Sequence, residues 1–228
     1  MTARPDPLLE SLRGELIVSC QAYPGEPMRD PEIMARVARS AELGGAAGIR
    51  AQGLDDIARI RSLVTIPVIG LVKTGTEGVF ITPTVQDALA VVRSGAHIVA
   101  VDATRRQRPG GESLSSIVRA VHDETGALIL GDIGSTADAE FAALAGVDAV
   151  ATTLAGYTGE RPSDGGPDIE LVDELARLLP LPVFAEGRVH SPQQARQALD
   201  AGAHAVIVGT AITHPASITS WFKEALRR

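Results

Sequence analysis

Six polar side chains each close a short apolar run of this sequence. These residues are Gln21, Arg50, Lys73, Asp102, Asp132 and Glu186, and the runs they end are β-prone, as in Leu16-Ile-Val-Ser-Cys-Gln21. Only a parallel barrel or a doubly wound sheet gathers so many strand ends on one face. Gathered there, these groups form a candidate active site that can hydrogen-bond and transfer protons.

Lys73 ends the buried run Pro67-Val-Ile-Gly-Leu-Val-Lys73. A lysine in this place is unusual, because desolvating an unpaired ammonium costs free energy. A structural lysine would extend to solvent or pair with a carboxylate. A functional lysine would carry a tuned amine, either a general base or a Schiff-base nucleophile, and the sequence leaves both open.

Acidic groups are available to tune that amine. Glu186, at the end of the seventh expected strand, is the natural partner of Lys73, and Asp102 and Asp132 end the fourth and fifth. Carboxylates near a lysine change its proton affinity and can hold substrate hydroxyls. For both aspartates the alternative is hydrogen-bonded scaffolding. Arg50 could hold a carbonyl, a phosphate or one of these acids, or form a structural ion pair in the barrel mouth.

A phosphate subsite is expected after the last two strands. The backbone N–H groups of Gly187, Arg188, Gly209 and Thr210 could converge on an anion there, with a short helix beyond Thr210 adding positive potential. Glycine allows the close approach of a phosphate to the backbone. The plainer alternative is that both glycines serve tight turns only.

The histidines do not predict a metal site. His97 and His204 begin strands, at the face opposite the site, and His122 lies in an expected helix. Only His190 and His214 could reach the strand ends, and neither has a ligand spacing to another histidine. We therefore expect no metal.

These residues must be positioned by alternating strands and helices. Apolar runs without polar alternation are typical of parallel strands that are buried on both faces. The expected strands are 16–20, 46–50, 67–72, 97–102, 127–132, 148–152, 182–186 and 205–209, and the expected helices are 30–43, 54–63, 84–94, 112–124, 136–145, 168–179, 191–201 and 215–227. Thr84 and Ser191 are expected N-caps, the latter followed by proline.

An internal repeat favours a closed barrel over an open sheet. A glycine that ends a helix and precedes a buried strand recurs at Gly44, Gly95, Gly146 and Gly202, at intervals of 51, 51 and 56 residues. Four βαβα units and eight strands predict one (β/α)8 TIM barrel over residues 1–228, with 1–14 as a lead-in segment.

Composition narrows the class of partner. The 228 residues carry a net charge of −7, which argues against nonspecific binding to nucleic acid. The densest basic cluster, Arg105-Arg-Gln-Arg108, is either a solvated loop or a local anion or interface site. Cys20 is the only cysteine, and neither a signal-peptide core nor a membrane-spanning run is present. We expect a cytoplasmic protein without nucleic-acid or membrane partners.

Several stretches, in order over nearly the whole chain, resemble the N-acylglucosamine-6-phosphate 2-epimerases, also called N-acetylmannosamine-6-phosphate 2-epimerases. They are Leu16-Ile-Val-Ser-Cys-Gln-Ala, Gly44-Gly-Ala-Ala-Gly-Ile-Arg50, Ile69-Gly-Leu-Val-Lys73, Ile81-Thr-Pro-Thr, Val101-Asp-Ala-Thr-Arg, Thr152-Thr-Leu-Ala-Gly-Tyr-Thr158, Ala185-Glu-Gly-Arg188 and Val208-Gly-Thr-Ala-Ile-Thr213. The first and sixth strings are not generic barrel sequence, so the resemblance is specific.

The resemblance implies a TIM barrel that interconverts N-acetylmannosamine 6-phosphate and N-acetylglucosamine 6-phosphate in sialic acid and amino-sugar catabolism. It implies a catalytic pair, here Lys73 and Glu186, and no redox cofactor or metal. Gln21, Arg50 and Asp132 fall on the family's substrate-binding positions, and Thr153 and Tyr157 lie in a matching string and are added as candidates. In this scheme Lys73 carries the C2 proton, and Glu186 assists ring opening.

Two departures from the family pattern affect expectations about selectivity. The loop Thr74-Gly-Thr-Glu-Gly-Val-Phe80 is short and glycine-rich, and Gly131 stands where alanine is usual, with Gly134 near a usual serine. These leave the preferred acyl group open. The alternatives are a Schiff-base lyase and a non-catalytic phosphosugar sensor. The last helix, with Trp221 and Phe222, could pack either on a partner, which would give a homodimer, or on the barrel itself.

Overall fold

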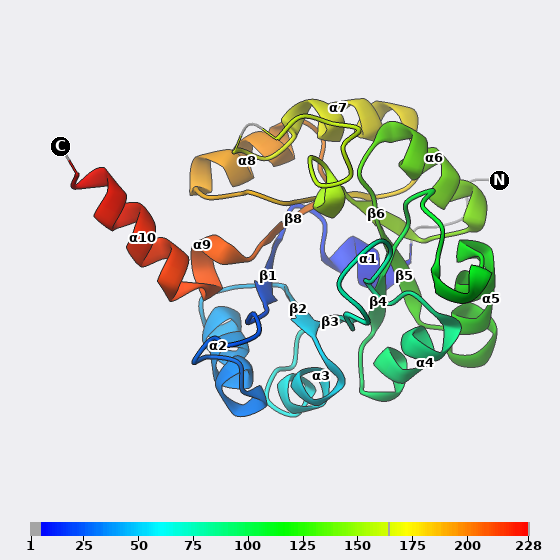
Figure 1. The fold of residues 1–228 in the computed structure, drawn as a ribbon, viewed down its shortest axis with the longest axis horizontal. Helices are drawn as coiled ribbons and strands as arrows, with labels where there is room; N and C mark the ends of the chain where they lie inside the picture. Colours follow the sequence, from blue (N-terminus) through cyan, green and yellow to red (C-terminus); the bar gives the residue numbers. More distant parts are fainter. Residues whose placement is uncertain (1–5, 164, 228) are drawn as a thin grey trace.

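A computed structural model describes residues 6–163 and 165–227, and its strands form a closed, all-parallel eight-stranded barrel in the order β1 to β8 (Figure 1). The strands are β1 Leu16–Cys20, β2 Gly48–Gln52, β3 Val68–Leu71, β4 Ile98–Asp102, β5 Leu128–Asp132, β6 Ala149–Ala151, β7 Val183–Glu186 and β8 Ala205–Val208. The expected TIM barrel is confirmed, and each strand agrees with its expected range to within two residues at either end.

The helices surround the barrel, except for α1, which lies across one end, and α10, which projects outward (Figure 1). They are α1 Pro7–Ser11, α2 Pro31–Leu43, α3 Leu54–Arg61, α4 Val85–Arg93, α5 Leu114–Thr125, α6 Thr136–Ala145, α7 Ile169–Leu178, α8 Pro192–Asp200, α9 Thr210–Thr213 and α10 Pro215–Ala225, with short 3-10 turns at Pro109–Gly111 and Thr152–Leu154. The predicted N-caps are confirmed: Thr84 Oγ1 accepts from Asp87 N, and Ser191 Oγ accepts from Gln194 N.

The repeat glycines end helices with one difference. Gly95, Gly146 and Gly202 have φ near +100°, the left-handed region that glycine enters without steric cost. In the first repeat this conformation belongs to Gly45 (φ 98°), because Gly44 still has helical angles as the cap of α2.

Part of the lead-in segment closes the barrel at its amino-terminal end. Leu9 and Leu12 are buried and belong to the apolar cluster that fills the barrel interior with Ile17, Ile69 and Phe184. His204 Nε2 is 2.7 Å from Leu9 O, and Gly14 N donates to His204 O. His204 therefore has a structural place at the face opposite the candidate site, as predicted, and α1 seals that face.

Register determines which side chains enter the barrel. In the strand pairs, Ser19 is level with Arg50, and Asp102 is level with Asp132. Ile69 and Leu71 face inward with the interior cluster, whereas Gly70 between them lies against Val91 of α4 and Ile57 of α3. This alternation brings the residues at the carboxyl ends of the strands together in the barrel mouth.

Candidate active site

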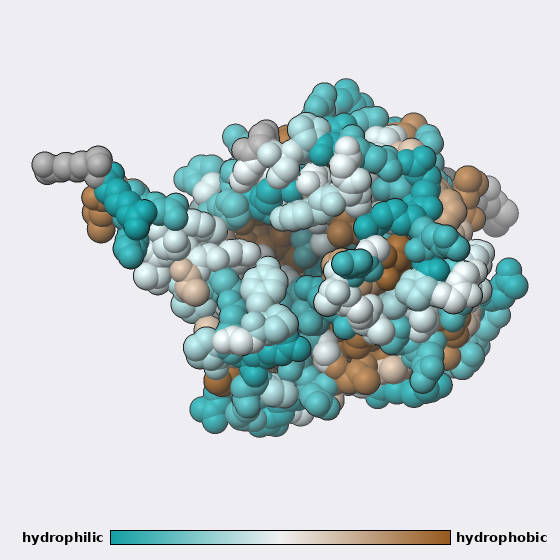
Figure 2. All heavy atoms as spheres, viewed as in Figure 1, coloured by the Kyte–Doolittle hydropathy of each residue, from teal (hydrophilic) through white to brown (hydrophobic). Residues whose placement is uncertain are grey.

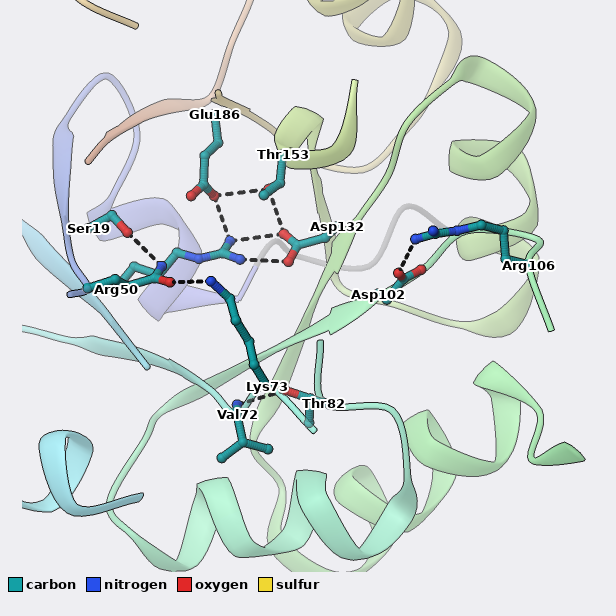
Figure 3. A network of polar contacts seen from close by, with 11 residues as sticks. Ser19, Arg50, Val72, Lys73, Thr82, Asp102, Arg106, Asp132, Thr153 and Glu186 are labelled. Carbon is teal, nitrogen blue, oxygen red and sulfur yellow. Dashed lines mark hydrogen bonds and ion pairs between the residues drawn. The ribbon is translucent and has the colours of Figure 1, made fainter. Parts of the chain in front are cut away.

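A buried arginine joins two of the predicted acids at the bottom of the barrel mouth (Figure 3). Arg50 of β2 donates two hydrogen bonds to Asp132 of β5, Nη1 to Oδ1 at 2.9 Å and Nη2 to Oδ2 at 2.6 Å. Its Nη1 also donates to Glu186 Oε2 of β7 at 2.6 Å. The side chains of Arg50 and Asp132 are 1% and 0% exposed, so the guanidinium is the counter-charge that makes burial of both carboxylates possible.

Thr153 completes this cluster from the turn after β6. Its hydroxyl lies 2.6 Å from Asp132 Oδ1 and 3.0 Å from Glu186 Oε2. The preceding Thr152 fixes the backbone of Glu186, because its Oγ1 donates to Glu186 O and accepts from Glu186 N. Glu186 is thereby held both at its carboxylate, by Arg50 and Thr153, and at its backbone, by Thr152.

Burial raises the pKa of Glu186 to about 7, and neighbouring Asp132 also raises it, while Arg50 and Thr153 act in the opposite direction. For Arg50, burial alone would lower the pKa, but the charges of Asp132 and Glu186 raise it above its ordinary value. Arg50 therefore stays charged, while Glu186 can gain or lose a proton near neutral pH. An acid that titrates near the working pH is suited to proton transfer.

Lys73 lies two residues beyond β3, and its side chain extends toward this cluster (Figure 3). Its Nζ donates to Gln21 Oε1 at 3.2 Å, and Gln21 Nε2 donates to Ser19 Oγ at 2.9 Å. The ammonium also lies 5.9 Å from the centre of the Tyr23 ring. Lys73 keeps an exposed side toward solvent, yet partial burial in the mouth lowers its pKa, and the charge of Arg50 lowers it further.

A cavity of about 480 Å³ opens above these groups. Its lining includes Gln21, Lys73, Thr153 and Glu186, together with the loops after β7 and β8. Arg50 and Asp132 are not part of that lining and lie beneath it. Their observed contacts orient Glu186 and Thr153, and direct contact with a ligand stays a prediction for both.

The predicted anion subsite lies at one side of the same cavity. Gly187 (φ 108°) and Arg188 (φ 54°) form a left-handed turn after β7, and Gly209 precedes α9. In the described part of the chain, the N–H groups of Gly187, Arg188 and Gly209 make no hydrogen bond to another backbone group. Successive free N–H groups in such turns form an anion-binding concavity.

The Arg188 side chain does not point its charge at the anion subsite but bonds the loop after β6. Its guanidinium donates to Gly166 O and Ala155 O, both at 2.6 Å, and lies 5.4 Å from the Tyr157 ring centre. It ties the loop after β6 to the β7 turn. Tyr157 is 65% exposed at the rim of the cavity, where it could touch a bound molecule.

The structure leaves Asp102 outside the Arg50 cluster, whereas sequence reasoning grouped them. Asp102 Oδ1 accepts from Thr104 N and Oγ1, and Oδ2 accepts from Arg106 Nη2 at 2.6 Å. Figure 3 shows this pair to one side of the Arg50 cluster. Ser19 was not predicted as a site residue, yet it lines the cavity and accepts a hydrogen bond from Gln21. It could have been found from the sequence, because it lies two positions before Gln21 and therefore on the same face of the strand.

Within 6–163 and 165–227, no three His, Cys, Asp or Glu side chains form a metal-binding group. Over the same ranges, no helix combines the length and the hydropathy needed to cross a bilayer. Figure 2 shows a largely hydrophilic surface on the face in view, with apolar atoms deeper toward the barrel axis.

The fold and the site together define a (β/α)8-barrel with ionisable groups gathered at the carboxyl ends of its strands, the place where barrel enzymes do their chemistry. A family model described as "Putative N-acetylmannosamine-6-phosphate epimerase" matches residues 34–228. The chain belongs to this family.

Two relatives match over nearly all of this chain and of their own length. A protein of Cutibacterium acnes named "Putative N-acetylmannosamine-6-phosphate 2-epimerase" is 52% identical and covers 100% of both chains. A Caldanaerobacter subterraneus protein of the same name is 45% identical, over 94% of this chain and 92% of its own.

Solved structures agree. The N-acetylmannosamine-6-phosphate 2-epimerase from Clostridium perfringens superposes with a TM-score of 0.93 at 39% identity, covering 98% of each chain. A thiamine phosphate pyrophosphorylase from Pyrococcus furiosus, at 17% identity and a TM-score of 0.62, shares the fold alone.

Proposed function

We propose that this protein is an epimerase that interconverts N-acetylmannosamine 6-phosphate and N-acetylglucosamine 6-phosphate, in the catabolism of sialic acid and amino sugars. Family membership at 40–52% identity to epimerases supports the reaction. The observation that carries the assignment within the structure is the placement of Lys73 and the titratable Glu186 in one cavity with a turn that can bind an anion.

The reaction inverts the carbon that bears the acetamido group. In the open-chain aldehyde, the C2–H bond is acidified by the neighbouring carbonyl. A base removes that proton, the electron pair is held as an enolate with its negative charge on the C1 oxygen, and a proton returns to the opposite face of C2.

Lys73 is our candidate for the proton carrier. Its lowered pKa increases the fraction of neutral amine, the form that can accept the C2 proton. Gln21, bonded to Nζ at 3.2 Å, positions the amine. Sugar oxygens are candidates for contact with Gln21, Thr153 and Tyr157, which all line the cavity.

Glu186 is our candidate for ring opening and for stabilising the enolate intermediate. Its pKa of about 7 lets it accept the proton of the anomeric hydroxyl and donate one back. Arg50 and Asp132 keep its carboxylate in place, and the positive charge of Arg50 favours negative charge on the intermediate. This chemistry requires no redox cofactor.

The test is proton NMR of the purified protein with N-acetylmannosamine 6-phosphate in D2O. We expect N-acetylglucosamine 6-phosphate with deuterium at C2. For Lys73→Ala we expect the rate to fall by at least about 100-fold, because a general base contributes on the order of 10²- to 10⁴-fold to the rate. Folded wild-type protein that forms no epimer would overturn the proposal. A covalent adduct trapped by borohydride with substrate would instead support the Schiff-base lyase.

We also infer a homodimer, for which α10 is the contact. Helix α10 projects away from the barrel, between α2 and α8 (Figure 1), and none of its described residues is buried. Phe222 and Leu226 are 71% and 83% exposed. Beside it an apolar groove over the outer faces of β1 and β8 includes Leu16, Val206 and Val208. An apolar helix of a second copy fits this groove.

Light scattering after size-exclusion chromatography tests the dimer. We expect a dimer for the wild-type protein and a monomer for Phe222→Asp, because a charge replaces the apolar anchor. Lys223→Gln, on the same helix, is the matched control and should stay dimeric. A monomeric wild type at all protein concentrations would exclude this assembly.

We place the protein in the cytoplasm, since the proposed substrate is a charged sugar phosphate.

A further inference from the structure

Two loops opposite the anion subsite are joined in the structure. The loop after β3 folds back on itself: Thr74 N donates to Phe80 O at 2.9 Å, and Thr82 N donates to Val72 O at 2.8 Å. Asp102 N, at the end of β4, then donates to Ile81 O at 3.0 Å. Phe80 and Ile81 are thereby placed in the cavity wall, where both are lining residues.

Arg106, from the loop after β4, lines the same cavity and is held from behind. Its Nη2 donates to Asp102 Oδ2 at 2.6 Å and its Nε to Thr104 Oγ1 at 3.0 Å (Figure 3). Asp102 and Thr104 are each 1% exposed, whereas the Arg106 side chain is 36% exposed. Two buried groups therefore fix one edge of the guanidinium and leave the other available to the cavity.

Barrel order gives this wall its relation to a ligand. In a closed barrel of eight strands, β3 and β4 lie across the axis from β7 and β8. A sugar phosphate whose C6 phosphate lies on the turns after β7 and β8, and whose C2 lies at Lys73, directs its C2 substituent toward the loops after β3 and β4. That substituent is an amide carbonyl with a small alkyl group.

We infer that Arg106, Phe80 and Ile81 form the subsite that recognises the N-acyl group, with Arg106 donating to the acyl oxygen and the two apolar residues packing on the alkyl group. This inference rests on the proposed function. Asp102 is then a positioning residue, which acts on the ligand through Arg106. The subsite gives the loop after β3 and the basic cluster after β4 a common role in selectivity.

Calorimetric titration with two ligands tests the role of Arg106. N-acetylglucosamine 6-phosphate carries the acyl group, and glucose 6-phosphate has the same phosphate without it. For Arg106→Met we expect the Kd of the acylated ligand to rise about 10- to 100-fold, because one charge-assisted hydrogen bond is lost. The Kd of glucose 6-phosphate should change by less than about twofold. Arg106→Lys should show an intermediate rise.

Arg105→Met is the matched control, because Arg105 bonds Asp138 and Glu160 and is not a lining residue. It should change neither Kd. An equal loss for both ligands in Arg106→Met would assign Arg106 to the fold or the phosphate and overturn the subsite, as would no change in either. In those cases the wild type still forms the epimer, so the proposed function stands; a wild type that forms no epimer overturns both.

A second variant tests the apolar half. Phe80→Ala enlarges the subsite, so the ratio of kcat/KM for an N-butanoyl substrate to that for the N-acetyl substrate should rise at least about fivefold. This is the effect expected when about one to two additional methylenes of the substrate are buried. An unchanged ratio, with the variant folded and active on the N-acetyl substrate, would overturn the contact with Phe80.

Discussion

At the scale of single residues, the site depends on opposite charges held without water. Arg50 is buried with two acids, and the structure satisfies its Nη groups through Asp132 and Glu186. A third acid in that pocket would have no counter-charge, and Asp102 has its own arginine on the other side of the mouth. Burial first, and then the nearby charge of Asp132, raise the pKa of Glu186 although Arg50 opposes them, and an acid with a raised pKa is suited to proton transfer.

This arrangement predicts how stability depends on pH. The pKa of Glu186 is about 7 in the folded protein against an ordinary value of 4.5, so the folded state binds this proton more tightly than the unfolded state. The stabilisation is complete below pH 4.5 and is lost as pH rises to about 7. Glu186→Gln removes that loss, so relative to wild type its unfolding free energy should increase over this range by on the order of 2 kcal/mol.

Urea unfolding of both proteins at pH 5 and pH 8 measures the difference. The same variant should lose at least about 100-fold in kcat, as expected for removal of an acid–base group. A variant equally stabilised or destabilised at both pH values would contradict a raised pKa for Glu186.

At the scale of elements, close packing between strands and the next layer leaves little space at the glycines. A Cβ on Gly131 of β5 would lie 2.8 Å from the Cβ of Ala103, and its other neighbours would be at ordinary distances of 3.5 Å or more. Gly131 precedes Asp132, so a shift there also moves the partner of Arg50. Gly131 is thus matched in size to Ala103.

The matching predicts a rescue. Gly131→Ala should lower the unfolding free energy by about 1–3 kcal/mol, the usual result of overpacking, and should lower kcat through Asp132. Adding Ala103→Gly relieves the one close contact, so the two changes should couple favourably by at least about 0.5 kcal/mol in a double-mutant cycle. Additive effects in thermal unfolding would show that the strand adjusts without Ala103.

At the scale of the whole molecule, the closed barrel brings the ends of six strands and the loops that follow them into one cavity, while α1 seals the opposite end. A ligand in that cavity contacts loops that are far apart in the sequence. Ligand binding should therefore stabilise the fold as a unit, because only the folded chain presents the site.

Thermal unfolding with N-acetylglucosamine 6-phosphate tests this linkage. At 100 times its Kd, the ligand adds about 2.7 kcal/mol, which should raise the Tm by about 5–10 °C for a chain of this length. Gly209→Val should lose most of the rise, because a bulky side chain beside Ser19 would alter the anion turn. A full rise in the variant would place the phosphate elsewhere.

The sequence by itself determined the fold and predicted most of the polar residues that the structure gathers in the barrel mouth. Uninterrupted Val and Ile runs, capped helices and the repeated glycines predicted eight strands in one barrel, because both strand faces must be buried and each helix must end where glycine permits it. Because the carboxyl ends of parallel strands meet at one face of a barrel, the polar residues that close those runs were expected together there, namely Gln21, Arg50, Lys73, Asp102, Asp132 and Glu186.

The tertiary structure decided what each group is bonded to. Barrel closure and register set which acid meets Arg50, so Asp132 and Glu186 share it and Asp102 pairs with Arg106. Local sequence cannot give these pairings, since they join residues 82 and 136 positions apart. The pKa of Glu186 also follows from burial and neighbouring charge, which exist only once the chain has folded.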